Sequence, residues 1–175
     1  MPKQFIALIF FVLLLVSSLF AWHTSQKPSQ TQQAFALAEF SLPDLAGTIH
    51  SISEWHGKIL IINFWATWCP PCLKEIPELI QLQAEYSSQN VQFIGIAIDE
   101  PGLVEDYLSF TDINYPVLIA ESDGGGLSQK LGNTVNAIPF TAIVNQQKQV
   151  IFHHPGELSK QRLRELIEPL LSANQ

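Results

Sequence analysis

The stretch FWATWCPPC, residues 64–72, contains both cysteines of the chain, Cys69 and Cys72. Two cysteines separated by two residues can open and close a disulfide, or their thiolates can bind a metal. An inert disulfide staple is a third possibility, but a loop this short constrains the unfolded chain little and therefore stabilises little. A zinc site needs two further ligands at matching spacing, and the sequence has no second cysteine pair. The spacing therefore favours a redox-active pair over a staple or a metal site.

The segments around the pair place it where a buried strand turns into a helix. Residues 58–66 form a continuous apolar run, which is typical of a strand buried on both faces. Residues 70–86 carry apolar side chains along one face at helical spacing. The N-terminus of a helix presents free N–H groups and partial positive charge, which stabilise a thiolate. We therefore expect Cys69, at the exposed cap position, to be the nucleophile, and Cys72, one turn further on and more enclosed, to be the resolving thiol.

Strand-like and helix-like segments alternate over the rest of the chain. The predicted strands are 91–98, 115–120, 140–144 and 150–154, and the predicted helices are 101–112, 124–132 and 158–171. The last two strands flank a polar turn and form a hairpin. Alternating strands and helices predict a mixed or parallel sheet that is covered on both faces.

The first 22 residues predict a membrane anchor. Behind the single charge of Lys3, the chain is uncharged and mostly apolar as far as Trp22. About 20 apolar residues cross a bilayer as a helix, and the basic flank keeps the N-terminus in the cytoplasm. A cleavable signal peptide is the alternative, but Leu19-Phe20-Ala21 has a large residue where the cleavage site needs a small one. We therefore predict an uncleaved signal-anchor over residues 1–22, with the following chain outside the cytoplasm.

A polar segment and one folded domain follow the apolar run. Residues 23–34 contain a proline and no apolar periodicity, which predicts a flexible linker. Residues 35–175 are enough for one well-packed domain. The chain has a formal net charge of −7 and no cluster of Lys and Arg, so a nucleic-acid-binding surface is excluded.

The order of these motifs resembles the thioredoxin superfamily. FWATWCPPC is followed by Pro77 inside the helix and by Ile138-Pro139 ahead of a strand. The sequence from Phe40 to Cys72 is similar to the membrane-anchored TlpA/ResA-like thiol:disulfide reductases, and the resemblance covers residues 38–172. It implies an α/β thioredoxin-like fold, a central mixed β-sheet flanked by helices, with an N-terminal β-hairpin extension. It also implies that Pro139 is cis, beside the disulfide, and that the backbone of its loop pairs with an extended client segment.

The resemblance further implies an acidic residue that moves a proton for Cys72. Thioredoxins carry a buried Asp in the strand before the motif, where this chain has Asn63. In the TlpA/ResA-like branch an acid at the end of the next strand takes over, and Glu100 matches it, with Asp99 as the neighbouring candidate. A carboxylate there could remove the Cys72 proton during resolution of a mixed disulfide. We predict Glu100 as the proton relay; the alternative is that both acids only form a turn and a helix cap.

The residues next to the pair predict a client-binding surface. Trp68 directly precedes Cys69 and is expected to be an exposed aromatic anchor, with Pro70, Pro71, Ile138 and Pro139 completing the surface. Neither proline of the motif has an N–H, so a thiolate at the cap receives fewer hydrogen bonds. A less stabilised thiolate makes the reduced pair the better electron donor.

We therefore expect a thiol:disulfide reductase, single-pass in the cytoplasmic (inner) membrane, with its catalytic domain on the periplasmic or extracytoplasmic side. The resemblance implies protein clients with disulfides, apocytochrome c during cytochrome c maturation among them, and a membrane thiol donor of the DsbD/CcdA type. We expect a monomer with no metal and no cofactor other than the Cys69–Cys72 disulfide. A redoxin-type peroxidase is one alternative, although its Pro-x-x-x-Thr-x-x-Cys pattern is not matched by Thr67. A copper-handling thioredoxin-like module is another, and it would need ligands beyond the pair.

Overall fold

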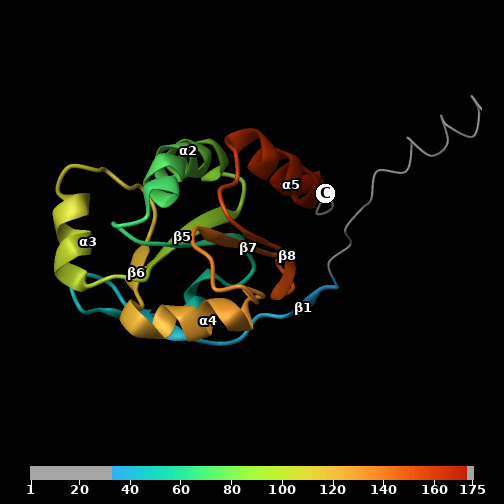
Figure 1. Cartoon of the computed structure of the whole chain (residues 1–175). Coiled ribbons are helices and arrows are strands. Elements are labelled where there is room, and N and C mark those ends of the chain that lie inside the picture. The colour runs from blue at the N-terminus through green and yellow to red at the C-terminus, as the bar shows by residue number, and fades with distance from the viewer. Residues whose placement is uncertain (1–32, 173–175) are drawn as a thin grey trace, which may run out of the picture. The chain divides into compact units, whose positions relative to one another are not determined.

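The computed structural model describes residues 33–172 (Figure 1). The predicted signal-anchor, residues 1–22, lies outside these residues, and so does the predicted linker except for Gln33 and Ala34. These two residues are exposed and belong to no strand or helix. Within the described part of the chain, no helix is both long enough and apolar enough to span a membrane.

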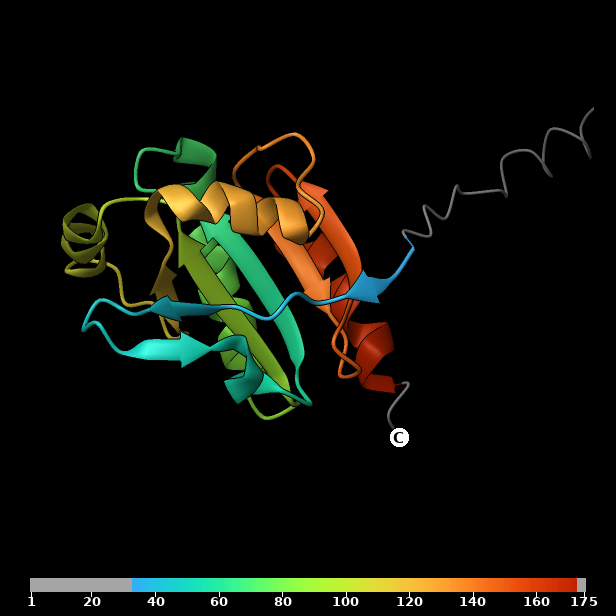
Figure 2. The ribbon, with the colours of Figure 1, turned by 90° about the horizontal axis from the view of Figure 1, so that it is seen from below.

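A mixed six-stranded sheet forms the centre of the fold (Figure 2). Its strands are β1 (Phe35–Ala36), β4 (Ile59–Trp65), β5 (Val91–Ala97), β6 (Val117–Ile119), β7 (Phe140–Val144) and β8 (Gln149–Pro155), and their spatial order is β1-β8-β7-β4-β5-β6. Strands β4, β5 and β6 are parallel, whereas β7, β8 and β1 add antiparallel pairs. Every residue of β4 is buried, which is why its sequence reads as one apolar run.

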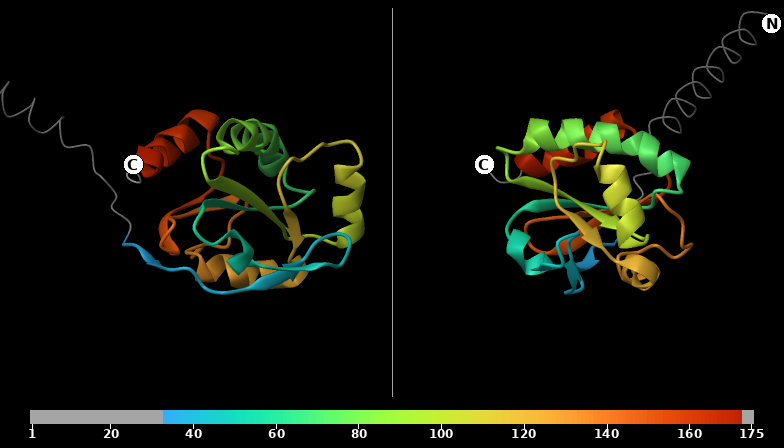
Figure 3. Two further views of the ribbon diagram at one scale, coloured as in Figure 1. Left: turned by 180° about the vertical axis from the view of Figure 1, so that it is seen from behind. Right: turned by 90° about the vertical axis from the view of Figure 1, so that its left-hand side faces the viewer.

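Helices cover both faces of this sheet (Figures 1 and 3). The helices are α2 (Pro70–Tyr86), α3 (Pro101–Leu108), α4 (Gly124–Lys130) and α5 (Lys160–Ser172). Helices α2 and α5 lie on one face and α4 on the other. Alternate residues of β4 serve the two faces: Ile59 and Ile61 pack with α2 and α5, and Leu60, Ile62 and Phe64 pack on the opposite side. The predicted α/β fold with a central mixed sheet flanked by helices is confirmed.

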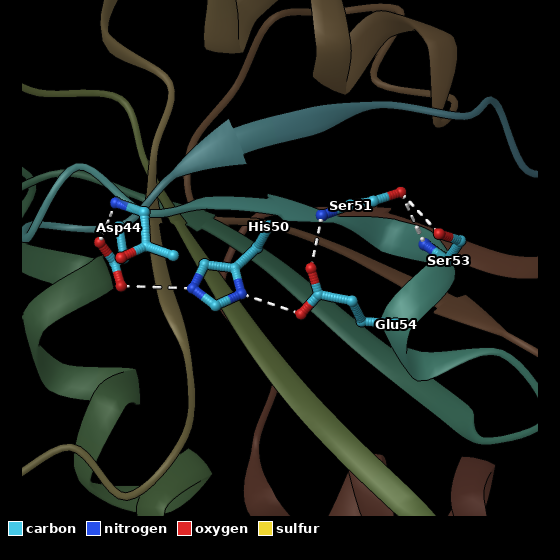
Figure 4. A network of polar contacts seen from close by, with 6 residues as sticks. Asp44, His50, Ser51, Ser53 and Glu54 are labelled. Atoms are coloured by element: carbon cyan, nitrogen blue, oxygen red, sulfur yellow. Dashed lines mark hydrogen bonds and ion pairs between the residues drawn. The ribbon is translucent and has the colours of Figure 1, made fainter.

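An N-terminal hairpin lies outside the main sheet. It consists of β2 (Ser41–Pro43) and β3 (Ile49–Ser51), and a short 3-10 turn, η1 (Ile52–Trp55), follows. Ile52 and Trp55 are buried in the same cluster as Phe64, so the turn fastens the hairpin to the core. Figure 4 shows His50 between two carboxylates, with Nδ1 2.9 Å from Glu54 Oε2 and Nε2 3.2 Å from Asp44 Oδ2.

Most element boundaries lie within two residues of the sequence prediction, and two differences are larger. Helix α3 ends at Leu108, four residues before the predicted end at position 112, because the Ser109 hydroxyl donates to the carbonyl of Asp106 at 2.7 Å and caps the last turn. Strand β1 has no counterpart in the prediction, since a strand of two residues carries no periodicity. It pairs Phe35 with Val150 at the edge of the sheet.

Candidate active site: a cysteine pair at the start of a helix

Cys69 and Cys72 form a disulfide at the point where β4 passes into α2. The S–S distance is 2.06 Å and the two Cα atoms are 5.3 Å apart. Cys69 is the N-cap residue of α2, with Pro70 and Pro71 in the first turn. The prolines lack N–H groups, so the first free donor of the helix is the N–H of Cys72, which points at Cys69 Sγ at 3.3 Å. A thiolate on Cys69 would therefore receive one backbone hydrogen bond from the helix.

Cys69 is less accessible than the sequence led us to expect. It is 5% exposed, against 1% for Cys72. Both cysteines belong to an apolar cluster that also contains Trp65 and Ile76, and Ile138 packs against this cluster. Cys69 remains the more exposed of the two, so the predicted order of accessibility holds, but its opening to solvent is narrow because this apolar cluster encloses it.

Asp99 holds the segment that leads into the motif. One carboxylate oxygen, Oδ2, accepts from the N–H of Thr67 at 2.9 Å and from its hydroxyl at 2.6 Å. The other oxygen accepts from the N–H of Glu100 at 2.9 Å. Asp99 is 7% exposed, and its oxygens are occupied by these donors. Its role in the structure is to tie the β4–α2 turn to the end of β5, which positions Trp68 and Cys69.

Glu100 is the residue for which we predicted a proton relay. It is the N-cap of α3, its side chain is exposed, and it makes no side-chain cap hydrogen bond. The relay role of Glu100 therefore stays a prediction, and this geometry does not support it.

A third acid, Glu75, was not identified from the sequence, and it is the buried carboxyl nearest to the pair along α2. It lies three residues after Cys72, on the same buried face of the helix, and is 1% exposed. Its Oε1 accepts from the backbone N–H of Leu158 at 3.1 Å, and its Oε2 accepts from Asn63 Nδ2 at 3.4 Å. Asn63 Nδ2 also donates to Thr141 Oγ1 at 3.0 Å. The sequence signal was available: a Glu among apolar residues at helical spacing behind a reactive cysteine.

Burial raises the pKa of Glu75 from its ordinary value of 4.5 to about 7. The hydrogen bonds from Leu158 and Asn63 oppose this shift because they favour the charged form, but they are the smaller effect. A carboxyl with a pKa near neutrality can both accept and return a proton at physiological pH. Glu75 thus has the properties that the sequence analysis assigned to Glu100.

The peptide bond between Ile138 and Pro139 is cis. Ile138 packs against the apolar cluster that contains both sulfurs, and Pro139 is buried. The carbonyl of Pro139 accepts from the N–H of Gly156 at 2.7 Å, which fixes the start of β7 to the end of β8. The structure therefore brings Ile138, from the cis-proline loop, against the cluster that contains both cysteines.

Exposed apolar side chains flank the cysteines in the motif. Trp68 is 62% exposed, and Pro70 and Pro71 are exposed beside it. Val135, in the loop before the cis-proline, is 65% exposed and was not identified from the sequence. Large apolar side chains in water favour contact with another molecule. In the described part of the chain, no group of three or more His, Cys, Asp and Glu side chains could hold a metal ion.

Comparison with known proteins agrees with this geometry. The Redoxin family model matches residues 30–167. Thiol-disulfide oxidoreductase ResA of Halalkalibacterium halodurans is 31% identical over 130 residues, which are 74% of this chain and 72% of the relative. Thioredoxin-like protein YneN of Bacillus subtilis is 29% identical over 148 residues, 82% of this chain and 84% of the relative.

Solved structures show the same fold. A thioredoxin-family thiol:disulfide interchange protein from Chlorobium tepidum TLS has a TM-score of 0.69 and 28% identity, and the match covers 80% of this chain and 98% of the other. A DsbE-type thiol:disulfide interchange protein from Chlorobium tepidum has a TM-score of 0.72 at 23% identity, covering 81% and 99%. The fold is therefore thioredoxin-like, with the cysteine pair at the start of α2. The chain belongs to the Redoxin family and, within it, to the thiol-disulfide oxidoreductases of the ResA type.

Proposed function

We propose that this oxidoreductase acts as a reductase of disulfides in client proteins. The observation that carries the proposal is the N-cap position of Cys69 against Cys72, with the buried carboxyl of Glu75 on the same helix face. In the reduced protein, the Cys69 thiolate attacks a client disulfide, an S–S bond forms between Cys69 and the client, and one client thiolate leaves. Cys72 then attacks Cys69 Sγ, the Cys69–Cys72 disulfide closes, and the second client thiolate leaves. The client gains two electrons and the pair loses two.

Glu75 supplies the base for the second step. Cys72 is almost fully enclosed, so its thiol cannot lose a proton directly to water. The Glu75 carboxyl, with its pKa raised to about 7, takes that proton as Cys72 attacks and passes it on as the client thiolate leaves. The N–H of Leu158 and the amide of Asn63 hold the carboxyl in place throughout.

The direction of electron flow is argued from the donors around Cys69. In the first turn of α2, the N–H of Cys72 donates a hydrogen bond to Cys69 Sγ, whereas Pro70 and Pro71 have no N–H to donate. A thiolate with few donors is stabilised little, so the reduced pair gives up its electrons readily. We expect a reduction potential nearer to that of thioredoxin, about −270 mV, than to that of a strong oxidant, about −120 mV.

The cellular setting is part of the proposal. The apolar run of residues 1–22 supports a single-pass anchor in the cytoplasmic membrane, with the catalytic domain on the periplasmic or extracytoplasmic side. A reductase there needs a source of electrons, and the resemblance to TlpA/ResA-like reductases supports a membrane thiol donor of the DsbD/CcdA type. The same resemblance supports apocytochrome c as a client. We propose that the protein works as a monomer and that the disulfide is its only redox group.

The test is a trapping experiment on the full chain. Cys72→Ser should accumulate covalent mixed disulfides with clients, because the attacking thiol is present and the resolving thiol is missing. Cys69→Ser should accumulate almost none, because the remaining thiol is 1% exposed. Trapping by Cys69→Ser instead would overturn the assignment of nucleophile and resolver. A parent potential near −120 mV in glutathione buffers would overturn the reductase assignment.

A further inference from the structure

One buried side chain holds the loop that carries the cis-proline. This loop, residues 131–139, joins α4 to β7, and Asn133 within it is 1% exposed. Asn133 Nδ2 donates to the carbonyl of Ala137 at 2.8 Å, and Asn133 Oδ1 accepts from the N–H of Ala137 at 3.1 Å. A single carboxamide thus binds both backbone polar groups of the residue before Ile138. A carboxamide can do this because it carries an acceptor oxygen and a donor NH₂ group on two separate atoms.

Helix α4 holds the amide in turn. Asn133 Nδ2 also donates to Ser128 Oγ at 3.1 Å, and the backbone N–H of Asn133 donates to the carbonyl of Ser128 at 3.0 Å. Ser128 is 1% exposed, and its hydroxyl donates to the carbonyl of Gly125 at 2.9 Å. The amide cannot rotate without breaking three hydrogen bonds in a buried place, where each unmade bond is costly. Asn133 therefore transmits the position of α4 to the loop.

The entry to the loop is equally constrained. Gly132 has a φ of +104°, and a Cβ at this position would lie 2.7 Å from Cδ2 of His153 on β8. The backbone therefore passes so close to β8 that only glycine fits, and Asn133 follows at a fixed place. At the other end, the carbonyl of Pro139 accepts from the N–H of Gly156 at 2.7 Å.

Between these two anchors lie Ile138 and the cis peptide bond. Ile138 packs on the cluster that contains Cys69 and Cys72. The distance from this loop to the disulfide is consequently set from one side by Asn133 and from the other by Gly156. Asn133 itself makes none of its hydrogen bonds to the cysteine motif. Its loss would shift the loop while leaving the Cys69–Cys72 geometry as it is.

We propose that Asn133 is a positioning residue for thiol–disulfide exchange with protein clients: its amide holds Ala137 so that Ile138 and Pro139 face the disulfide in the geometry that an extended client segment requires. The inference rests on the proposed function, because it assumes that clients are proteins. A small disulfide needs access to Cys69 alone, whereas a protein client must also fit against the loop. Asn133 should therefore matter for proteins and not for small molecules.

The experiment compares Asn133→Ala with Asn145→Ala in the full-length protein. Asn145 is the control because its side chain also binds backbone groups, with Oδ1 accepting from the N–H groups of Gln147 and Gln149, but at the far end of β7. Each reduced protein is assayed with insulin as a protein disulfide and with 5,5′-dithiobis(2-nitrobenzoate) as a small one. Thermal unfolding of each variant sets an assay temperature at which all are folded.

We expect Asn133→Ala to lower kcat/KM for insulin by about tenfold, chiefly through KM, because a loop displaced by a fraction of an ångström misaligns the client. Its rate with the small disulfide should stay within about twofold of the parent, since access to Cys69 is unchanged. Asn145→Ala should match the parent with both. Ser128→Ala, which removes one partner of the amide, should move insulin reduction in the same direction by less, and it serves if Asn133→Ala does not fold.

Equal losses with insulin and the small disulfide would overturn the proposal, as would an insulin defect of the same size in Asn145→Ala. A parent protein that does not reduce insulin at all would contradict the proposed function. This result differs from a failure of the Asn133 proposal, in which the parent reduces insulin but the variants do not differ as expected. If the parent does not reduce insulin, the comparison is made in the reverse direction, with oxidised enzyme and a reduced, unfolded protein. The loop serves both directions of one exchange reaction, so a defect confined to Asn133→Ala and to the protein client supports the positioning role there too.

Discussion

At the scale of single residues, three acids close to the cysteine pair have three different environments. Asp99 is buried, and its carboxylate accepts hydrogen bonds from the backbone N–H and the hydroxyl of Thr67. Glu100, its neighbour, is exposed. Glu75 is buried with two donors, and burial outweighs them in raising its pKa to about 7. Environment therefore separates one positioning carboxylate, one solvated carboxylate and one carboxyl that can exchange a proton near neutral pH.

This difference predicts a pH-dependent effect of Glu75→Gln on the resolving step. We expect release of client from the mixed disulfide to slow by about tenfold to a hundredfold, because a general base is lost. The parent rate should rise with an apparent pKa near 7, and the variant should lack that step. The measurement is the rate of mixed-disulfide resolution against pH by rapid quenching. Glu100→Gln is the matched control, and a defect in that variant in place of Glu75→Gln would return the relay to Glu100.

Glu75 also links stability to pH. A folded-state pKa raised from 4.5 to about 7 contributes stability that is fully present below 4.5 and is lost as the pH rises through about 7. A shift of this size corresponds to about 3 kcal/mol of unfolding free energy. Urea unfolding at pH 5 and pH 8 should show most of this loss in the oxidised parent, and the loss should be smaller by that amount in Glu75→Gln, in which other groups such as His50 still titrate. An equal loss in both proteins would assign the pH dependence to other groups.

At the scale of elements, the imidazole of His50 links the turn of the N-terminal hairpin to η1. His50 lies between the carboxylates of Glu54 and Asp44, and its hydrogen bonds to them raise its pKa above 6.5. The hydrogen bond with His50 is the largest cause that lowers the pKa of Glu54, whereas the pKa of Asp44 is lowered first by the hydrogen bond from the N–H of Thr48 and then by His50. The hairpin contact is therefore complete when the histidine is charged and both carboxylates are ionised. It weakens as the pH rises through the raised pKa of His50.

We therefore predict that hydrogen exchange of the hairpin amides of Thr48 and Ser51, corrected for intrinsic rates, is slower at pH 6 than at pH 8. His50→Gln should remove this difference, because a neutral amide does not titrate. His56→Gln is the control, since His56 also faces a carboxylate, Glu39 at 3.6 Å, but outside the hairpin. A pH difference that survives in His50→Gln would rule out the imidazole as its source.

At the scale of the whole molecule, the fold gathers the site from four places in the chain. The β4–α2 turn brings the cysteines, and the segment after β5 brings Asp99. The α4–β7 loop brings the cis-proline, and the segment between β8 and α5 brings the Leu158 N–H to Glu75. Parallel strands β4 and β5 end at the same edge, which is where active sites of such sheets lie. Trp68, in the turn that follows β4, is exposed to solvent.

The remaining prediction concerns the attachment of this domain to a membrane. We expect residues 1–22 to remain on the protein and to leave the catalytic domain outside the cytoplasm, because the run is apolar, long enough to cross, and preceded by a basic residue. Membranes washed with carbonate should retain the protein, and protease added from the outer side should digest the domain. Recovery of a soluble form that begins after Ala21 would contradict the anchor.

The sequence alone determined what depends on neighbouring residues. Local periodicity and spacing predict the strand that precedes the motif, the helix over residues 70–86 and the cap position of Cys69. Helix α2 begins and ends where predicted. The cis state of Pro139 came from family resemblance, because a proline before a strand does not by itself specify its isomer. Charge and composition excluded a nucleic-acid-binding surface, because the net charge of −7 and the absence of a Lys and Arg cluster can be read from the sequence without the fold.

Only the tertiary structure decided which acid is buried and which residue holds the loop. Glu75 and Glu100 have the same side chain, and their difference arises from packing. Glu75 is buried and accepts hydrogen bonds from Leu158 and Asn63, which are 83 and 12 residues away in the sequence. Glu100 is exposed. Asn133 reads in sequence as a loop residue, yet folding places its amide in the interior against α4. Burial depends on contacts between distant segments, and the pKa of a carboxyl and the rigidity of a loop depend on burial.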